Sequence, residues 1–139
     1  MKQTIFIAYN TDSIVDDNTI VKEPCCKCEE QRRSIFQTLY DKYKSDGKYE
    51  LYFDILHDEY GKKDLYYHID KNESIISMDN TRAIIFVIST AEVSFWQLLE
   101  AFFASYHNKK ILYISVKKFI KLINGHKLDR FIDYHLRRK

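Results

Sequence analysis

Glu100 is the residue whose surroundings most favour chemistry. It lies in the stretch "SFWQLLEAFF", residues 94–103, four positions after Trp96. On a helix these two residues are neighbours one turn apart, and Glu100 falls at the edge of an apolar face. That face is formed by Phe95, Leu98, Leu99, Phe102 and Tyr106. A carboxyl group beside an indole can have its pKa raised by desolvation, and it can bind sugar hydroxyls. The same spacing also fits an ordinary charge at the rim of a packed helix.

Polar residues follow two apolar stretches that have the character of buried strands. Tyr9, Asn10 and Asp12 end or follow the run "TIFIAY", and Ser89 ends the run "AIIFVIS". In open parallel sheets, ligands bind beyond the carboxyl ends of the strands. These residues are therefore candidates for binding a substrate, although Asp12 and Ser89 would serve equally well in turns or helix caps.

The elements that must position these residues alternate between strands and helices. We predict strands at residues 4–9, 49–56, 83–89 and 110–115, with the first and third in the centre of the sheet. Helices are predicted at 29–47, where Gly47 ends the helix, at 72–81 with Asn72 or Ser74 as its cap, and from about Ser94. The tail from residue 117 is predicted to be helical, with a break at Asn124–Gly125. Such alternation predicts an α/β fold whose parallel sheet has helices on both faces.

Length and composition favour a single domain over residues 1–139, with a long polar loop at about 10–28 and a basic helical segment at about 117–139. The net charge of +2 favours no class of partner. From Lys109 onward there are ten lysines or arginines against Asp129 and Asp133. We interpret this segment as a solvated helix face, so nucleic acid is not an expected partner. The sequence has no apolar run that fits a signal peptide or a membrane span.

Cys25, Cys26 and Cys28 are the only cysteines. An odd, clustered set makes a poor disulfide framework, so we expect a reducing compartment and a cytoplasmic protein. Paired Cys-x-x-Cys elements are missing, and we predict no metal site.

Three segments, taken together, resemble the TIR (Toll/interleukin-1 receptor-like) domain family of prokaryotic type. The stretch "IFIAYNTDS" is similar to the opening box of that family, and "AIIFVIST" to its central strand ending in serine. Ser94, Trp96 and Glu100 match its S-x-W-x-x-x-E helix motif. This resemblance implies a flavodoxin-like three-layer sandwich around a parallel sheet of about five strands.

The resemblance to TIR domains also implies an activity. It implies an enzyme that consumes NAD as a substrate, without a cofactor, and cleaves the nicotinamide N-glycosidic bond to make a cyclic or conjugated ADP-ribose signal in antiviral defence. Glu100 would be catalytic and Trp96 would pack against it. Tyr9, Asn10 and Asp12 would line the pocket, and Ser89 would bind the substrate. The family resemblance further implies a homo-oligomer.

Two alternatives remain open. The stretch "EAFFASYHNKKILYI" is similar to an element of nucleoside 2-deoxyribosyltransferases, in which Glu100 would again be catalytic. In that case the partner is a nucleoside, and the reaction is base exchange or nucleoside hydrolysis. In both families the attacked bond is N-glycosidic and the transition state resembles an oxocarbenium ion, which a carboxylate can stabilise or attack. The third possibility is a TIR-like interaction module without catalytic activity.

Overall fold

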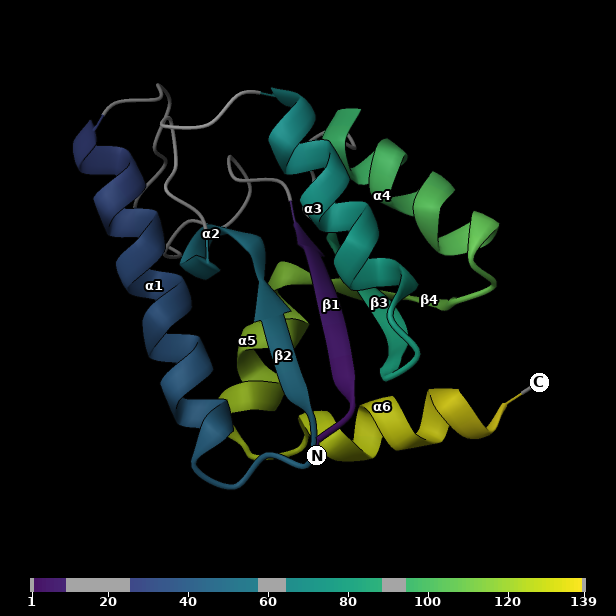
Figure 1. Cartoon of the computed structure of the whole chain (residues 1–139). Helices are drawn as coiled ribbons and strands as arrows, with labels where there is room; N and C mark the ends of the chain where they lie inside the picture. The colour runs from purple at the N-terminus through teal and green to yellow at the C-terminus, as the bar shows by residue number, and fades with distance from the viewer. Residues whose placement is uncertain (1, 10–25, 58–64, 89–94, 139) are drawn as a thin grey trace.

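The computed structural model describes residues 2–9, 26–57, 65–88 and 95–138. The chain forms alternating strands and helices over these ranges (Figure 1). In chain order they are β1 (Thr4–Tyr9), α1 (Cys26–Lys44), β2 (Glu50–Phe53), α2 (Asp54–His57), α3 (Leu65–Ser77), β3 (Thr81–Ile88), α4 (Phe95–Tyr106), β4 (Lys110–Ser115), α5 (Val116–Asn124) and α6 (Leu128–Arg137). None of the helices in the described ranges is long and apolar enough to cross a membrane.

The strands form one sheet in the order β2-β1-β3-β4, and every neighbouring pair is parallel. The predicted parallel α/β architecture is therefore confirmed, with four strands in the described part where about five were expected. The two central strands were also identified correctly, as β1 and β3. Every residue of β1 is buried, because helices cover both faces of the sheet.

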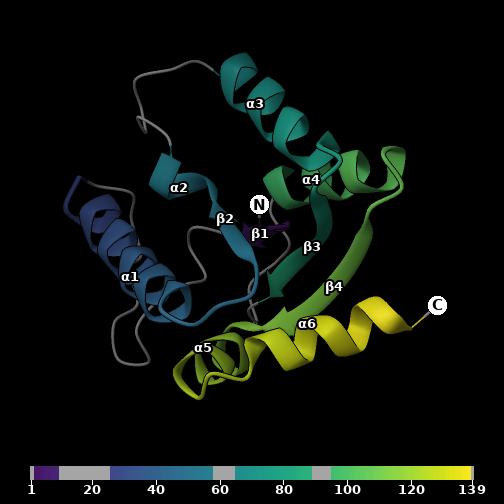
Figure 2. The ribbon, with the colours of Figure 1, turned by 60° about the horizontal axis from the view of Figure 1, so that its bottom comes forward.

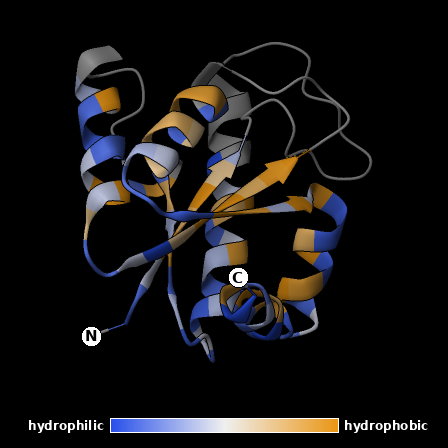
Figure 3. Cartoon of the chain, turned by 90° about the vertical axis from the view of Figure 1, so that its right-hand side faces the viewer, coloured by the Kyte–Doolittle hydropathy of each residue, from blue (hydrophilic) through white to orange (hydrophobic). Residues whose placement is uncertain are grey.

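Helices lie on both sides of the sheet and give the three layers of a flavodoxin-like fold (Figure 2). On one face, α1, α5 and α6 pack against the sheet around Phe36, Phe119 and Ile132. On the other face, α3 and α4 pack around Ile76 and Phe103. The hydrophobic arrowheads of the strands in Figure 3 lie between these two helical layers.

The tail is broken where the sequence predicted a break. The Ser115 side chain caps α5 by accepting a hydrogen bond from the Lys118 amide, and Gly125 ends the helix. His126 follows with a φ of 56°, in the left-handed region, and this turns the chain into α6. Figure 1 shows α6 running across the end of the molecule where β1 and β2 begin.

Three predicted boundaries were wrong. Strand β2 ends at Phe53, and Asp54 begins the short helix α2. Helix α3 begins at Leu65, so Asn72 lies inside it and does not cap it; its buried face combines Asn72 and Ile76 with the partly buried Ile69. Helix α1 begins at Cys26, within the segment expected to be a loop. Local patterns locate the ends of elements less well than their existence.

Candidate functional site

Glu100 lies on the face of α4 that packs against the sheet. Glu100 is only 6% exposed, and Gln97, Phe103 and Ala104 are buried on the same face. Three of the residues expected at the apolar centre of this helix point outward instead, with Leu98 60%, Phe102 61% and Tyr106 71% exposed, while Leu99 packs against the core cluster as expected. The predicted orientation of α4 was therefore wrong for these three residues, and Glu100 is buried where an edge position was expected.

Gln97 explains why a polar face can be buried here. Its side-chain amide donates hydrogen bonds to the backbone carbonyl oxygens of Ala8, at 3.5 Å, and Val87, at 3.2 Å. Those carbonyls lie near the carboxyl ends of two adjacent strands, β1 and β3. The chain moves from β1 outward to β2 and later returns to β3 on the other side of β1. Gln97 thus marks the switch in strand order, where ligands bind in open α/β sheets.

Asp54 reaches the same region from the end of β2. Phe53 pairs with Ile7 of β1, so the following residue lies level with Ala8. Tyr52 and Ala8 belong to the core cluster beneath α3 and α4. The negative charge of Asp54 acts on Glu100, so Asp54 lies near Glu100 at this end of the sheet. Ala8 is fully buried and contributes only a methyl group at this position.

The electrostatics of Glu100 are those of a buried acid next to another acid. Burial raises the pKa of the Glu100 carboxyl well above its ordinary value, and the negative charge of Asp54 raises it further. The Glu100 Oε2 atom has no hydrogen-bond partner among the described residues. A carboxyl in this state can donate a proton, or it can ionise when a positive charge arrives to compensate it.

We expected Tyr9 to line the pocket beside Glu100, but the structure does not bring these two residues together. Its ring packs against Phe36, with centroids 4.3 Å apart, in the core cluster under α1. That cluster is on the opposite face of the sheet from α4. Side chains alternate along β1, so Ala8 faces Glu100 while Tyr9 points away.

The remaining predicted site residues are placed only in part. Trp96 lies in the first turn of α4, next to Gln97, but its side chain lies outside the described residues. Asn10, Asp12 and Ser89 also lie outside them. Cys26 and Cys28 lie in the first turn of α1. The described residues contain no group of three or more His, Cys, Asp or Glu side chains that could hold a metal ion.

His57 and Tyr52 form an aromatic pair near Asp54. Their rings are stacked 4.5 Å apart and nearly parallel, at 6°. The His57 backbone carbonyl accepts a hydrogen bond from the Lys71 ammonium group, which ties α2 to α3. The pair therefore fixes α2 against the end of β2, next to Asp54.

Sequence reasoning missed Asp54 and Gln97. Asp54 was assigned to the interior of a strand predicted to run to residue 56. An acid directly after the apolar triplet Leu51–Phe53 was the available signal, because such triplets often end a buried strand. For Gln97 the sequence offers no comparable signal, since its partners are backbone carbonyl oxygens distant in sequence.

Comparison of the chain with protein-family models, with curated proteins and with solved structures finds no match.

Proposed function

We propose that this protein cleaves the N-glycosidic bond of a nucleotide at its ribose anomeric carbon, with NAD as the substrate. The observation that carries the proposal is the buried Glu100 carboxyl, with an unpartnered oxygen, beside Asp54 at the carboxyl ends of the strands. The resemblance of the motif that contains Glu100 to the helix motif of TIR domains supports the same reaction and the same catalytic residue. An ADP-ribose signal in antiviral defence is the role that this resemblance suggests.

The proposed step matches a buried acid to a positively charged substrate. The nicotinamide ring of NAD carries a positive charge, which lowers the pKa of a nearby carboxyl and favours ionised Glu100. When the bond between the anomeric carbon and the ring nitrogen breaks, its electron pair leaves with neutral nicotinamide. The positive charge then moves to the ribose, where the Glu100 carboxylate stabilises it. Water adds to the anomeric carbon and loses a proton, giving ADP-ribose.

Asp54 has a separate part in this scheme. The negative charge of Asp54 disfavours ionisation of Glu100 in the absence of substrate. The two neighbouring acids are therefore not both charged in the free protein. Once Glu100 is ionised against the substrate, Asp54 can accept the proton of the attacking water. We therefore assign Glu100 to charge stabilisation and Asp54 to proton transfer.

Incubation with NAD tests the proposal directly. Nicotinamide and ADP-ribose products are separated by HPLC, at both low and high protein concentration, because assembly could be required. We expect Glu100→Gln to lower nicotinamide release by about 10²-fold or more. Glu73→Gln is the matched control, since the Glu73 side chain is 44% exposed on α3. Equal activity of wild type and Glu100→Gln would refute the role of Glu100.

A nucleoside substrate is the alternative within the same chemistry. Neutral bases are poor leaving groups and need a proton, which a carboxyl with a raised pKa can donate. The raised pKa of Glu100 is the observation that favours this alternative. Deoxynucleosides in the same HPLC assay, with a second free base added, would reveal hydrolysis or base exchange.

The third candidate, a non-catalytic module that binds a second copy of the chain, is supported by the outer face of α4. Leu98, Phe102 and Tyr106 form an exposed apolar stripe there, at successive turns. Light scattering coupled to size exclusion would test it. Dimers that dissociate in Phe102→Lys, together with no turnover of either substrate, would favour this function.

A further inference from the structure

The outer face of α6 gathers arginines around one exposed tyrosine. Arg130, Tyr134, Arg137 and Arg138 recur at helical spacing and line an open hollow of about 440 Å³. Tyr134 is 58% exposed, and the Arg138 guanidinium lies over its ring, 5.6 Å from the centroid. From Arg130 to Arg137, the last residue of α6, the helix rises roughly 10 Å.

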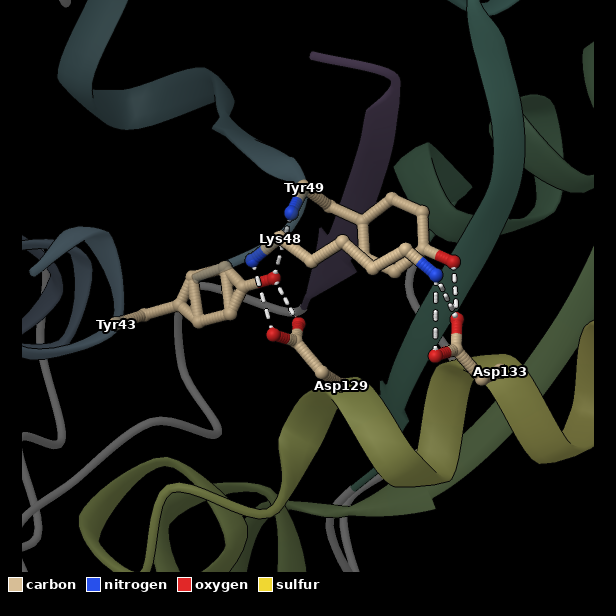
Figure 4. Close-up of polar contacts among 5 residues, drawn as sticks. All are labelled: Tyr43, Lys48, Tyr49, Asp129 and Asp133. Carbon is tan, nitrogen blue, oxygen red and sulfur yellow. Dashed lines mark hydrogen bonds and ion pairs between the residues drawn. The ribbon is translucent and has the colours of Figure 1, made fainter. Parts of the chain in front are cut away.

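Further cations from other elements surround this face. The Lys110 ammonium group of β4 donates to the Arg138 carbonyl oxygen. Burial lowers the pKa of His135, and the positive charges of Arg138, Lys110 and Lys118 lower it further. Asp133 is the only acid lining the hollow, and it is already bound by Lys48 at 3.2 Å and by the Tyr49 hydroxyl (Figure 4). The face therefore carries an excess of positive charge that its own acid does not neutralise.

The residue types favour one kind of anion. Guanidinium groups bind phosphate in a bidentate manner and stack on flat rings, which ammonium groups do not. An exposed tyrosine ring among such groups offers a surface on which a base can stack. Stacking of a base would use the ring and the arginines together, so we favour nucleic acid over a lipid headgroup, which the charge alone would also attract.

We propose that this face of α6 binds single-stranded nucleic acid, with Arg130, Arg137 and Arg138 on the phosphates and Tyr134 against a base. The face lies where the strands begin, whereas Glu100 and Gln97 lie near the ends of β1 and β3. Six residues of strand separate the two regions by roughly 20 Å. Binding at α6 is thus independent of cleavage at Glu100, and each can fail without the other.

Fluorescence anisotropy with labelled oligouridine and oligothymidine, each about 20 nucleotides long, tests this binding at about 50 mM salt. Neutralising the face in Arg130→Gln/Arg137→Gln/Arg138→Gln should weaken binding at least tenfold and flatten its salt dependence. The control is Lys117→Gln/Lys121→Gln/Lys127→Gln, which removes three exposed charges elsewhere on α5 and its junction with α6. It should change the affinity by much less.

A second pair of variants isolates the ring. Tyr134→Leu should weaken binding by roughly fivefold or more, while Tyr106→Leu, at an exposed tyrosine on α4, should not. Circular dichroism confirms that each variant is folded. No binding of either oligonucleotide, or equal losses in the arginine and lysine triple variants, would overturn the proposal. Binding to phosphatidylserine vesicles with no binding to oligonucleotides would overturn it in favour of a membrane surface.

Discussion

Burial of the Glu100 carboxyl costs free energy of folding, which a residue with a purely structural role would not need to cost. Its neighbours in the fold supply no partner for Oε2 among the described residues, and Asp54 adds repulsion. A buried carboxyl that is poorly compensated destabilises the folded state whenever it is ionised. Such a residue is expected where binding or catalysis benefits from it.

The first prediction concerns stability. The pKa of Glu100 is raised in the folded state, so burial of this residue carries no penalty from ionisation below its ordinary pKa of 4.5, where the unfolded chain is protonated too. Stability is lost as the pH rises from that value through the folded pKa. Glu100→Gln removes this loss and should stabilise the protein by about 1–3 kcal/mol at pH 7. The difference in Tm should shrink towards pH 4, as measured by scanning calorimetry; a less stable variant at pH 7 would contradict it.

The pH dependence of turnover separates the two substrates. Cleavage of NAD needs ionised Glu100, so kcat/KM should rise with pH through the raised pKa of this residue. Nucleoside cleavage needs protonated Glu100, so kcat/KM should fall over the same range. A profile measured with each substrate therefore assigns the role of the carboxyl. A flat profile for both would show that Glu100 does not titrate in the rate-determining step.

At this scale the sequence singled out Glu100 as a candidate but not its surroundings. Spacing from Trp96 made Glu100 a candidate, whereas the position of Asp54 depends on where β2 ends. Tyr9 was misplaced because the sequence does not show which helices cover each face of the sheet. Without that knowledge, the alternation of β1 does not tell whether Ala8 or Tyr9 faces α4. Those assignments depend on packing between segments distant in sequence, which local patterns do not contain.

At the scale of the element, α4 shows how a hydrophobic pattern can mislead. Its most apolar side, with Leu98, Phe102 and Tyr106, faces outward, and its buried side includes Gln97 and Glu100. Ala104 is small enough to approach the sheet closely, and Gln97 satisfies strand carbonyls. Hydrophobicity alone favours the opposite orientation, because it gives no weight to either of these contacts.

Replacing Gln97 tests this account of α4. Gln97→Met keeps the length of the side chain but removes the hydrogen bonds to Ala8 and Val87. We expect a loss of about 1–3 kcal/mol in the free energy of unfolding, because buried carbonyl oxygens lose a donor. Gln37→Met is the control, since Gln37 is exposed and donates a hydrogen bond to Asp41, at 3.0 Å, one turn along α1. Urea denaturation of both variants measures the difference, and equal effects would contradict this account of α4.

At the scale of the whole molecule, α6 ties together parts of the chain that are distant in sequence (Figure 4). The Tyr43 hydroxyl donates to Asp129 and accepts from the Tyr49 amide at 3.0 Å. Asp129 also accepts from the Lys48 amide at 2.9 Å. Burial and the hydrogen bond to Asp129 raise the pKa of Tyr43. These contacts join the end of α1, the start of β2 and α6.

Removing the Tyr43 hydroxyl should therefore weaken the fold as a whole. Tyr43→Phe leaves the ring in place but breaks both hydrogen bonds, and we expect a loss of about 1–3 kcal/mol in the free energy of unfolding. Tyr134→Phe provides the comparison, because the Tyr134 ring is exposed. Thermal denaturation monitored by circular dichroism measures both. The account of α6 fails if Tyr43→Phe is as stable as Tyr134→Phe.

Fold class was the part most accessible from the sequence. Alternating apolar strands and helices predicted the parallel three-layer architecture, and the continuous apolar runs within β1 and β3 indicated its centre. The role of α6 was not accessible in the same way. Asp129 and Asp133 appeared in the sequence only as two acids within a basic segment, and their partners lie more than 80 positions earlier.

The central position of β1 has a consequence for how the chain folds. Its first residue, Thr4, pairs with Glu50 on one side and with Thr81 on the other. Both contacts close long loops, and such topologies fold slowly. During synthesis β1 leaves the ribosome before either neighbouring strand exists, so the apolar run Ile5–Tyr9 is exposed without its sheet. The nascent protein thus depends most on protection from aggregation at β1.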